Sequence, residues 1–260
     1  MIPVNINPII FRLGSFQLTY YALNFLLGFV VSLIVLLQAI KNKKIKITKE
    51  QAYDLIILLL IGIVVGARLF HIIFWNLIYF KANPIEIFYI WQGGLSLHGG
   101  ILGAFIVGII FTRKNKIDFW KLADILVLPA IFMLALGRIA NFINVEILGK
   151  VTLLPWCVQF VGIEGCRHPI QLYAAAGRFA LFFLLLAISR KKNQKPGFIF
   201  WLFITLMGIG RFFLDFLRID THYLGLNAGQ WLSIAMFIIG SFALIKYYKR
   251  DLKSLLHKVL

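Results

Sequence analysis

Four polar side chains follow directly on an apolar stretch of the sequence, residues 125–136. They lie within the run 137–149 and are Arg138, Asn141, Asn144 and Glu146. Polar groups at the edge of a bilayer are costly, so they usually line an enclosed site rather than face lipid. The glycines that frame the run, Gly137 and Gly149, let the backbone approach another group closely. We therefore expect this run to form part of a binding site.

The geometry of the run depends on whether the preceding helix continues through it. In a continuing helix, Arg138 and Asn141 are three residues apart and share a face, which Asn144 extends. Glu146 would then hold Arg138 or Arg211 by a charge-assisted hydrogen bond. Alternatively, the helix ends here and Arg138 snorkels to the interface. That alternative explains the arginine but explains the two amides and the carboxylate poorly.

Three further polar clusters accompany this run. Tyr21 begins an apolar stretch, where a tyrosine is either an interfacial anchor or part of the site. His98 lies among four glycines in the segment 93–100, and it is either a satisfied core residue or a catalytic or binding group. The third cluster ends another apolar stretch, and its charged members are Arg211, Asp215 and Arg218. Their spacing also allows salt bridges within one helix.

Two more arginines lie inside apolar stretches. Arg68 could belong to the same polar interior, whereas the sequence assigns no role to Arg178. The obvious complement of several cations beside few anions is a bound anion, and arginine is the side chain suited to fork onto phosphate. Within a membrane the expected phosphate is a phospholipid headgroup. The sequence has no P-loop, zinc-ligand set or Ser/His/Asp arrangement, so nucleotide hydrolysis and serine-type acyl transfer are unsupported.

The composition places these residues in a membrane protein. The chain has 260 residues, of which 61% are hydrophobic and 14% charged, whereas a soluble domain is about 45–50% apolar and about 25% charged. A helix needs about 20 apolar residues to span a bilayer. The stretches that meet this need are 18–38, 53–75, 95–112, 121–137, 170–189, 198–216 and 230–248. We therefore expect an all-α, polytopic membrane protein with about seven transmembrane helices.

No linker, repeat or low-complexity tract divides the chain, so we expect one domain, residues 1–260, with a short outer loop at about 138–169. The N-terminal segment lacks a basic head, apolar region and small-residue cleavage site, so no cleaved signal peptide is expected. The two cysteines, Cys157 and Cys166, fall in the outer loop. They either pair in an oxidising compartment or remain free thiols, and neither has a histidine at a familiar metal spacing.

The net charge of +17 indicates membrane topology rather than binding to nucleic acid, because the basic residues lie in short loops between apolar stretches. Of the 27 Lys and Arg residues, 18 fall in the stretches 39–50, 113–121, 190–197 and 246–260. By the positive-inside rule these stretches are cytoplasmic. We therefore expect the N-terminus outside, the C-terminus in the cytoplasm and the polar clusters toward the outer face.

The run 137–149 resembles the signature of the bacterial prolipoprotein diacylglyceryl transferases, Gly-Arg-x-Gly/Ala-Asn-Phe-x-Asn-x-Glu-x-x-Gly. The segment 93–100 is similar to the family's Gly-Gly-x-Ser-x-His-Gly-Gly, and the segment 168–173 is similar to its His-Pro-x-Gln-Leu-Tyr. Other matching segments follow in the expected order, namely residues 7–11, 21–23, 211–218 and 229–230. The resemblance therefore covers essentially the whole chain.

The resemblance implies a transferase of the bacterial cytoplasmic (inner) membrane. Such enzymes move diacylglyceryl from phosphatidylglycerol to the lipobox cysteine of a prolipoprotein, form a thioether and release glycerol phosphate, with no metal or soluble cofactor. Carried over by motif, Arg138 would bind the headgroup, Arg211 would be the second cation, and His98 would be the base or orient the thiol. The residues expected to shape the pocket are Tyr21, Asn141, Asn144, Glu146 and Gly149. Those expected to support it are Arg68, Asp215 and Arg218.

The sequence departs from the family pattern at several positions. Val145 stands where Gly is common, Ala22 replaces a Gly, and Asp215 replaces a Glu. Ala174 and Met207 replace a Glu and a Tyr, and each change removes a polar group from the expected pocket. These changes leave a lipid-binding or inactive paralogue as an alternative. A small anion transporter is a further one, but the sequence lacks the internal repeat or paired broken helices typical of transporters.

Overall fold

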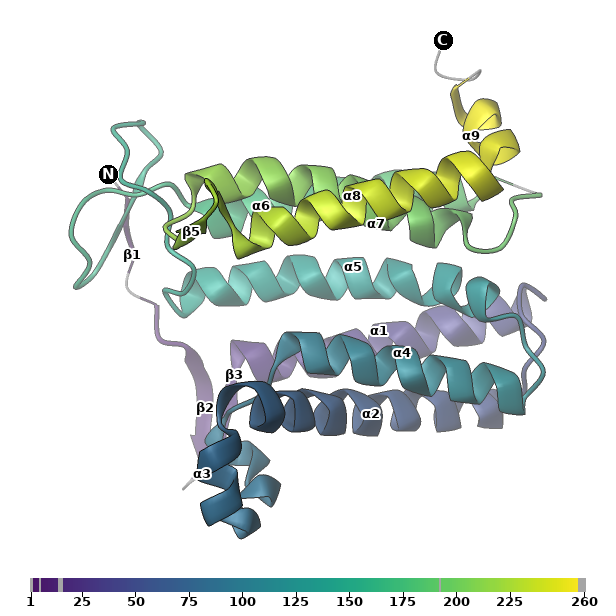
Figure 1. Ribbon diagram of the computed structural model, residues 1–260, viewed down its shortest axis with the longest axis horizontal. Helices are drawn as coiled ribbons and strands as arrows, with labels where there is room; N and C mark the ends of the chain where they lie inside the picture. The colour runs from purple at the N-terminus through teal and green to yellow at the C-terminus, as the bar shows by residue number, and fades with distance from the viewer. Residues whose placement is uncertain (1, 5, 14–15, 192, 257–260) are drawn as a thin grey trace. The chain divides into compact units, whose positions relative to one another are not determined.

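A computed structural model describes residues 2–4, 6–13, 16–191 and 193–256 of the chain (Figure 1). Its α-helices are α1 (Tyr20–Lys41), α2 (Lys49–Trp75), α3 (Leu77–Ala82), α4 (Leu97–Lys114), α5 (Phe119–Ile143), α6 (Ile170–Ser189), α7 (Phe198–Leu214), α8 (Ala228–Tyr247) and α9 (Lys249–Leu256). Its 3-10 helices are η1 (Pro84–Phe88), η2 (Ile90–Gln92) and η3 (Asp215–Leu217). Its strands are β1 (Ile2–Val4), β2 (Ile9–Leu13), β3 (Phe16–Thr19), β4 (Val158–Phe160), β5 (His222–Tyr223) and β6 (Leu226–Asn227).

The described residues form seven helices that are long and apolar enough to cross a membrane, as the sequence predicts. They are α1, α2, α4, α5, α6, α7 with η3, and α8. The clearest differences from the predicted bounds have local causes. Helix α2 begins at Lys49 rather than 53 because Thr48 caps it and exchanges hydrogen bonds with Gln51. Helix α5 passes the predicted end at 137 and continues to Ile143.

The expectation of an all-α chain needs one correction, because short strands pair outside the helices. Strand β1 pairs in parallel with β4, whereas β2 with β3 and β5 with β6 form antiparallel pairs. These strands are only two to five residues long. Such segments are too short to leave a clear alternating pattern in the sequence. The protein is therefore mostly helical rather than entirely so.

The chain divides into two compact units, residues 31–125 and residues 1–30 with 126–260. In the first unit, α2 and α4 pack so closely that facing glycines are required. A Cβ atom on Gly66 would collide with the backbone of Gly99, and one on Gly103 would collide with that of Gly62. Small residues that let backbones approach are typical of helix pairs in membranes. That the whole chain is one domain stays a prediction.

Arg68 ties the segment between α3 and α4 to helix α2. Its buried guanidinium donates hydrogen bonds to the carbonyl oxygens of Glu86, Ile87 and Gly93, at 2.5, 2.9 and 2.7 Å. The Glu86 carboxylate accepts a further bond from the Tyr79 hydroxyl at 2.6 Å, which raises the pKa of that phenol. Backbone carbonyl groups thus accept the hydrogen bonds of Arg68. The side chain supports the segment between α3 and α4 by holding it against α2.

In the second unit, α7 packs against both α6 and α8. Their shared core contains large apolar side chains from α5 to α8 and includes Val127, Leu185, Phe198, Leu202 and Leu244. A Cβ atom on Gly240 of α8 would collide with the Thr205 side chain of α7, so these two helices also need a glycine at their crossing. The antiparallel course of α6 and α7 places the start of α6 beside the end of α7.

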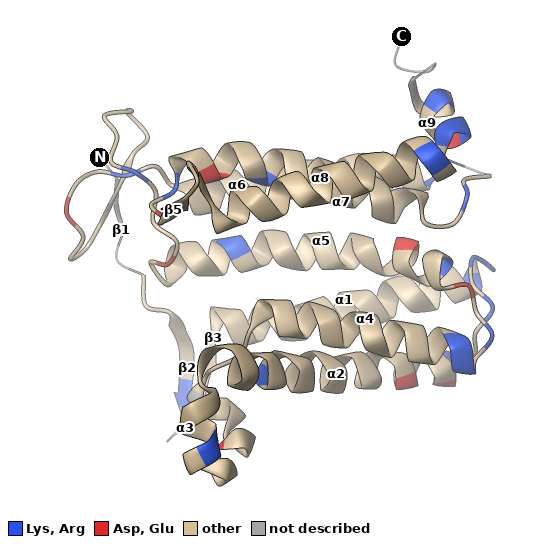
Figure 2. Ribbon diagram, viewed as in Figure 1, with Lys and Arg blue, Asp and Glu red and all other residues tan. Residues whose placement is uncertain are grey.

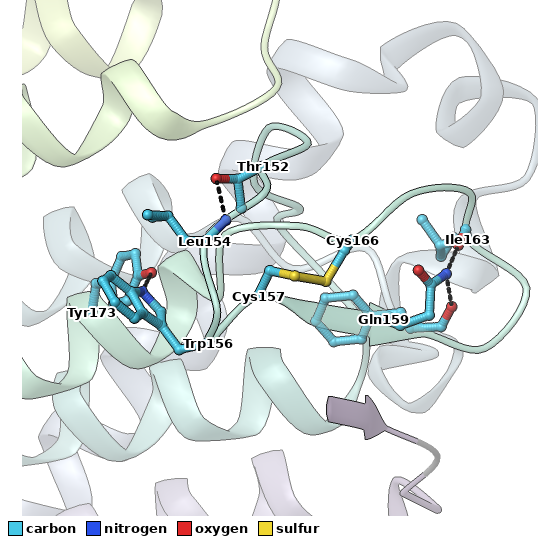
Figure 3. The surroundings of a disulfide bond; sticks show 9 residues. Thr152, Leu154, Trp156, Cys157, Gln159, Ile163, Cys166 and Tyr173 are labelled. Atoms are coloured by element: carbon cyan, nitrogen blue, oxygen red, sulfur yellow. Dashed lines mark hydrogen bonds between the residues drawn. A yellow bond between two sulfur atoms is a disulfide. The ribbon is translucent and has the colours of Figure 1, made fainter. Parts of the chain in front are cut away.

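The loop between α5 and α6 is held by a disulfide bond between Cys157 and Cys166 (Figure 3). Of the two alternatives for these cysteines, the structure therefore has the paired one. Around the bond, Val151 forms β-bridge contacts with Arg167, and Gly149 forms one with Arg218. The loop is thus connected through backbone pairing to the segment that follows η3.

Lysines and arginines gather in the loops at one end of the helices within each unit (Figure 2). In the unit of residues 31–125, a hydrogen bond of 2.7 Å from Gln51 to Asn115 brings the loops before α2 and after α4 together. In the other unit, the ammonium of Lys195 donates to the Tyr247 carbonyl at 3.2 Å, which joins the segments after α6 and α8. This clustering agrees with the predicted charge asymmetry, while the side on which each terminus lies stays a prediction.

Candidate functional site

Helix α5 continues through the polar run, which confirms the first of the two geometries considered for it. The Arg138 Nη1 atom lies 3.5 Å from Asn141 Oδ1, so the two side chains share a face as their spacing predicts. The amide of Asn144 still donates to the Ala140 carbonyl at 2.9 Å, one residue beyond the last helical position. A helix that ends at Arg138 is therefore excluded.

The turn after α5 closes with a residue in the left-handed region. The Glu146 amide donates to the Asn141 carbonyl at 2.9 Å, and the Val145 amide donates to that of Phe142 at 3.2 Å. This is the Schellman pattern, whose left-handed position is usually glycine. Here Val145 occupies that position with φ of 57°. Backbone geometry thus explains why the family pattern has glycine at this position. Valine adopts the same left-handed conformation at a cost in free energy.

Glu146 is the acceptor at the centre of a small polar network. Its Oε2 atom accepts from the Tyr21 hydroxyl at 2.9 Å and from Asn141 Nδ2 at 2.7 Å, while Oε1 accepts from Asn144 Nδ2 at 3.2 Å. Asn141 Nδ2 also contacts the Tyr21 hydroxyl. Within the described residues, no ion pair joins Glu146 to Arg138 or Arg211, so that prediction is wrong. The turn directs the carboxylate toward the amides and the tyrosine instead.

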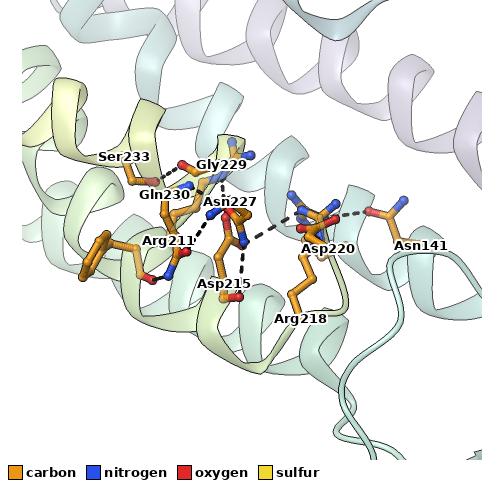
Figure 4. Close-up of polar contacts among 11 residues, drawn as sticks. Asn141, Arg211, Asp215, Arg218, Asp220, Asn227, Gly229, Gln230 and Ser233 are labelled. Carbon is orange, nitrogen blue, oxygen red and sulfur yellow. Dashed lines mark hydrogen bonds and ion pairs between the residues drawn. The ribbon is translucent and has the colours of Figure 1, made fainter. Parts of the chain in front are cut away.

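Arg211 has a different acidic partner on its own helix (Figure 4). Its Nε atom lies 3.5 Å from Asp215 Oδ2, and Arg218 Nη1 lies 4.0 Å from Asp215 Oδ1. The Asp215 carboxylate is almost completely buried, whereas Arg218 makes a closer contact of 2.9 Å with Asp220. The predicted spacing of four and three residues thus gives the predicted salt bridges, with Asp215 shared by two arginines.

The start of α8 supports this pair. Residues 229–230 match the family pattern, but the predicted site residues did not include them. Asn227 and Gln230 form a capping box, with bonds of 3.0 and 2.8 Å between backbone and side chain. A Cβ atom on Gly229 would collide with Asp215 Oδ2 and would lie 3.0 Å from Arg211 Nη2. Only glycine therefore allows α8 to begin this close to the ion pair. The Asn-x-x-Gln spacing was the signal that could have identified this helix start.

A cavity of about 340 Å³ opens between α5, α6 and α7. One part of its wall carries four guanidinium groups and a single carboxylate, namely Arg138, Arg178, Arg211, Arg218 and Asp215. The opposite part is apolar and includes Leu181, Leu184 and Leu206. A charged end joined to an apolar end suits an amphipathic ligand with an anionic head. Ala174 and Met207 also line the cavity, so both departures from the family pattern lie in its wall.

Nine of the predicted site residues belong to the unit of residues 1–30 and 126–260, and they are Tyr21, Arg138, Asn141, Asn144, Glu146, Gly149, Arg211, Asp215 and Arg218. Gly149 lies so close to the His168 carbonyl that a Cβ atom would collide with it. The Gln171 side chain donates to the Glu146 carbonyl at 2.6 Å and was not predicted. The remaining two, Arg68 and His98, belong to the unit of residues 31–125, where the His98 ring stacks on Phe70 with centroids 6.1 Å apart.

Seven apolar helices and a cation-lined cavity with an apolar end define a multi-pass membrane protein suited to an anionic lipid. Comparison with known proteins gives the family. Residues 8–246 match the family model described as prolipoprotein diacylglyceryl transferase, and the chain belongs to that family.

Curated relatives are similar over nearly their whole length. The chain is 39% identical to a phosphatidylglycerol–prolipoprotein diacylglyceryl transferase of Geobacter sulfurreducens, over 91% of this chain and 93% of the relative. It is 37% identical to the protein of that name from Rickettsia canadensis, over 93% of this chain and 96% of the relative. It is 35% identical to the protein of that name from Vibrio cholerae, over 95% of this chain and 94% of the relative.

Proposed function

We propose that this protein transfers diacylglyceryl from phosphatidylglycerol to the lipobox cysteine thiol of prolipoproteins, the first step of bacterial lipoprotein maturation. The observation that carries the proposal is the cavity, in which guanidinium groups from α5, α6 and α7 surround space that continues to an apolar wall. An anionic phospholipid matches both ends of such a space. Membership of the family and the names of its relatives support the choice of substrates.

The proposed reaction is a substitution at an alkyl carbon. The cysteine sulfur, as thiolate, attacks the glyceryl carbon that bears the phosphate, and a carbon–sulfur bond forms as the carbon–oxygen bond breaks. The electron pair of the broken bond stays on the phosphate oxygen, so glycerol phosphate leaves with one more negative charge than the diester had. A thiol with a pKa of about 8.5 is mostly protonated at neutral pH, so a base must first remove its proton.

The residues of the cavity have separate roles in this proposal. Arg138 binds the phosphate of the headgroup, and Arg211 is the second cation near the leaving group. Asn141, Asn144 and Glu146 form the network beside Arg138, to which Tyr21 is joined. Arg218 and Asp215 hold Arg211 in place, because Asp215 contacts both arginines.

His98 remains the candidate for the proton acceptor or for the group that orients the thiol. The reason is chemical, since imidazole is the side chain whose usual pKa suits proton transfer near neutral pH. Its glycine-rich segment matches the family pattern, which supports the assignment. We propose the bacterial inner membrane as the location, with the N-terminus and the cavity's charged end toward the outer face. The clustered basic loops support this orientation.

The function is tested with the full chain purified in nanodiscs. The protein is mixed with phosphatidylglycerol and a lipobox peptide, and the mass of the peptide and the released glycerol phosphate are measured. We expect one diacylglyceryl adduct for each glycerol phosphate released, and none on a peptide whose cysteine is replaced by serine. If the protein binds phosphatidylglycerol but gives no adduct where the Geobacter sulfurreducens relative does, the chain is a lipid-binding paralogue and the proposal fails.

A further inference from the structure

Among the residues that the structure describes, the buried cation Arg178 has no acidic partner of its own. It lies in the third turn of α6, lines the cavity and is 7% exposed. Its one hydrogen bond in the described structure runs from Nη1 to the Ala174 carbonyl of the same helix, at 3.3 Å, and its Nε atom is buried without a partner. Buried arginines are almost always paired, because an uncompensated charge is costly away from water.

The absence of a polar side-chain partner beside Arg178 agrees with two departures from the family pattern. Ala174 lies one helical turn before Arg178, the position from which an acidic side chain would pair with it. Met207 of α7 also lines the cavity and offers only a weakly accepting thioether sulfur. The departures that remove polar groups from the expected pocket therefore leave this guanidinium available to a ligand.

The charges around the cavity do not balance without a ligand. Arg178 is repelled by Arg138 and Arg211 and attracted by Asp215, which Arg211 and Arg218 already share. Asp220 is engaged with Arg218 at 2.9 Å. Four guanidinium groups thus line the cavity with one carboxylate, and Asp220 and Glu146 lie outside its wall, so the positive charges there exceed the negative ones. A phosphodiester such as phosphatidylglycerol supplies one negative charge, whereas a phosphomonoester supplies about two at neutral pH.

We propose that Arg178 is a further catalytic residue, which binds the departing phosphate and matches the negative charge that forms as the carbon–oxygen bond breaks. The inference rests on the proposed transfer reaction. In the ground state Arg138 and Arg211 are sufficient for the singly charged diester. As the electron pair moves onto the phosphate oxygen, Arg178 gains an anionic partner. A group that interacts more strongly with the transition state than with the substrate raises kcat rather than lowering KM.

Binding of soluble headgroup fragments tests this idea without turnover. The full chain is placed in phosphatidylcholine nanodiscs and titrated with glycerol phosphate, the dianionic product, and with glycerophosphoglycerol, the singly charged headgroup. We expect the wild type to bind glycerol phosphate about tenfold more tightly than the diester. The Arg178→Met variant should lose about tenfold in affinity for glycerol phosphate and little for the diester, while Arg178→Lys keeps most of the preference.

The matched control is Arg190→Met, at the other end of α6 and outside the cavity wall, which should bind both probes as the wild type does. Equal affinity of the wild type for the two probes would overturn the proposal. So would an unchanged preference in Arg178→Met. An equal loss of affinity for both probes, together with a lower Tm, would mean that Arg178 has a structural role and would contradict the proposal. We expect the opposite, an unchanged or higher Tm, because the variant removes an unpaired buried charge.

Turnover gives a second, independent readout. With phosphatidylglycerol and a lipobox peptide, Arg178→Met should lower kcat about tenfold or more and change KM for the lipid about twofold at most. A rise in KM at constant kcat would place Arg178 in ground-state binding and contradict the proposal. If the wild type forms no adduct, the transfer reaction itself fails, while the preference for glycerol phosphate still tests the charge assignment of Arg178.

Discussion

The Tyr21 hydroxyl donates a hydrogen bond of 2.9 Å to the Glu146 carboxylate, across 125 residues of sequence. This contact joins the first turn of α1 to the turn that follows α5. The same carboxylate accepts from Asn141, whose side chain faces Arg138. The tyrosine, the carboxylate, the amide and the cation therefore form one chain of contacts that ends at the cavity.

We expect Tyr21→Phe to lower transfer activity about tenfold, because Glu146 loses a hydrogen bond to a charged acceptor and no longer fixes Asn141 beside Arg138. The measurement is the initial rate of peptide adduct formation at several concentrations of phosphatidylglycerol. Tyr20→Phe is the matched control, since it removes a hydroxyl one residue earlier. Equal activity of the two variants would show that the network does not position the cation.

Much of the helical framework could be predicted from the sequence, because each spanning helix coincides with an apolar run. The shared face of Arg138 and Asn141 was also predictable, since three residues in a helix fix it locally. The partner of Glu146 was not, because the turn at Val145 and the placement of Tyr21 decide where the carboxylate points. Contacts over such separations depend on tertiary structure, which helical spacing does not contain.

Arg178 shows the same limit at the cavity. The sequence places it inside an apolar helix and gives no reason for it. A role for Arg178 can be inferred only from the packing of α6 against α7, because this packing places Arg178 and Arg211 in the wall of the same cavity. Ala174 and Met207 line the same cavity, and in the described structure the one hydrogen bond of Arg178 goes to the Ala174 carbonyl while its Nε atom has no partner.

We expect Arg138→Ala to lower adduct formation by about a hundredfold or more while the protein still inserts in the membrane. The reason is that Arg138 supplies a cation of the charged wall directly beside Asn141. Arg138→Lys keeps the charge but loses the planar fork, so its activity should lie between those of the alanine variant and the wild type. Arg190→Ala is the control for removal of an arginine elsewhere. Activity of Arg138→Ala near the wild-type level would mean that the headgroup binds elsewhere.

We expect Val145→Gly to stabilise the protein by about 1 kcal/mol, because a β-branched residue in the left-handed region costs about 1–2 kcal/mol. The φ angle of 57° at Val145 carries this prediction. The free energy of unfolding can be measured by denaturant titration of the purified chain. Val151→Gly is the control, because Val151 lies outside the positive-φ positions and glycine there should be neutral or destabilising. Destabilisation by Val145→Gly would contradict the account of this turn.

We expect Gly229→Ala to lower both stability and activity, because its Cβ atom would displace Asp215 from Arg211. Moving a buried carboxylate away from its partner costs about 3–5 kcal/mol in the worst case. Gly177→Ala is the stability control, since a Cβ atom there meets nothing within 4 Å and alanine favours the helix by about 1 kcal/mol. If both variants are equally stable, the close approach at Gly229 is not required.

We expect replacement of both Cys157 and Cys166 by serine to lower the free energy of unfolding by about 3 kcal/mol, on the chain-entropy estimate for a short closed loop. The bond closes a loop with a sequence separation of 9. Because this loop pairs at Gly149 with Arg218, activity should fall as well, through looser placement of a cavity cation. The measurements are unfolding and adduct formation with and without a reductant. The reductant should affect the wild type but not the double serine variant. If the wild type keeps full stability and activity when the disulfide is reduced, the loop does not help to place the cavity cation and the prediction is wrong.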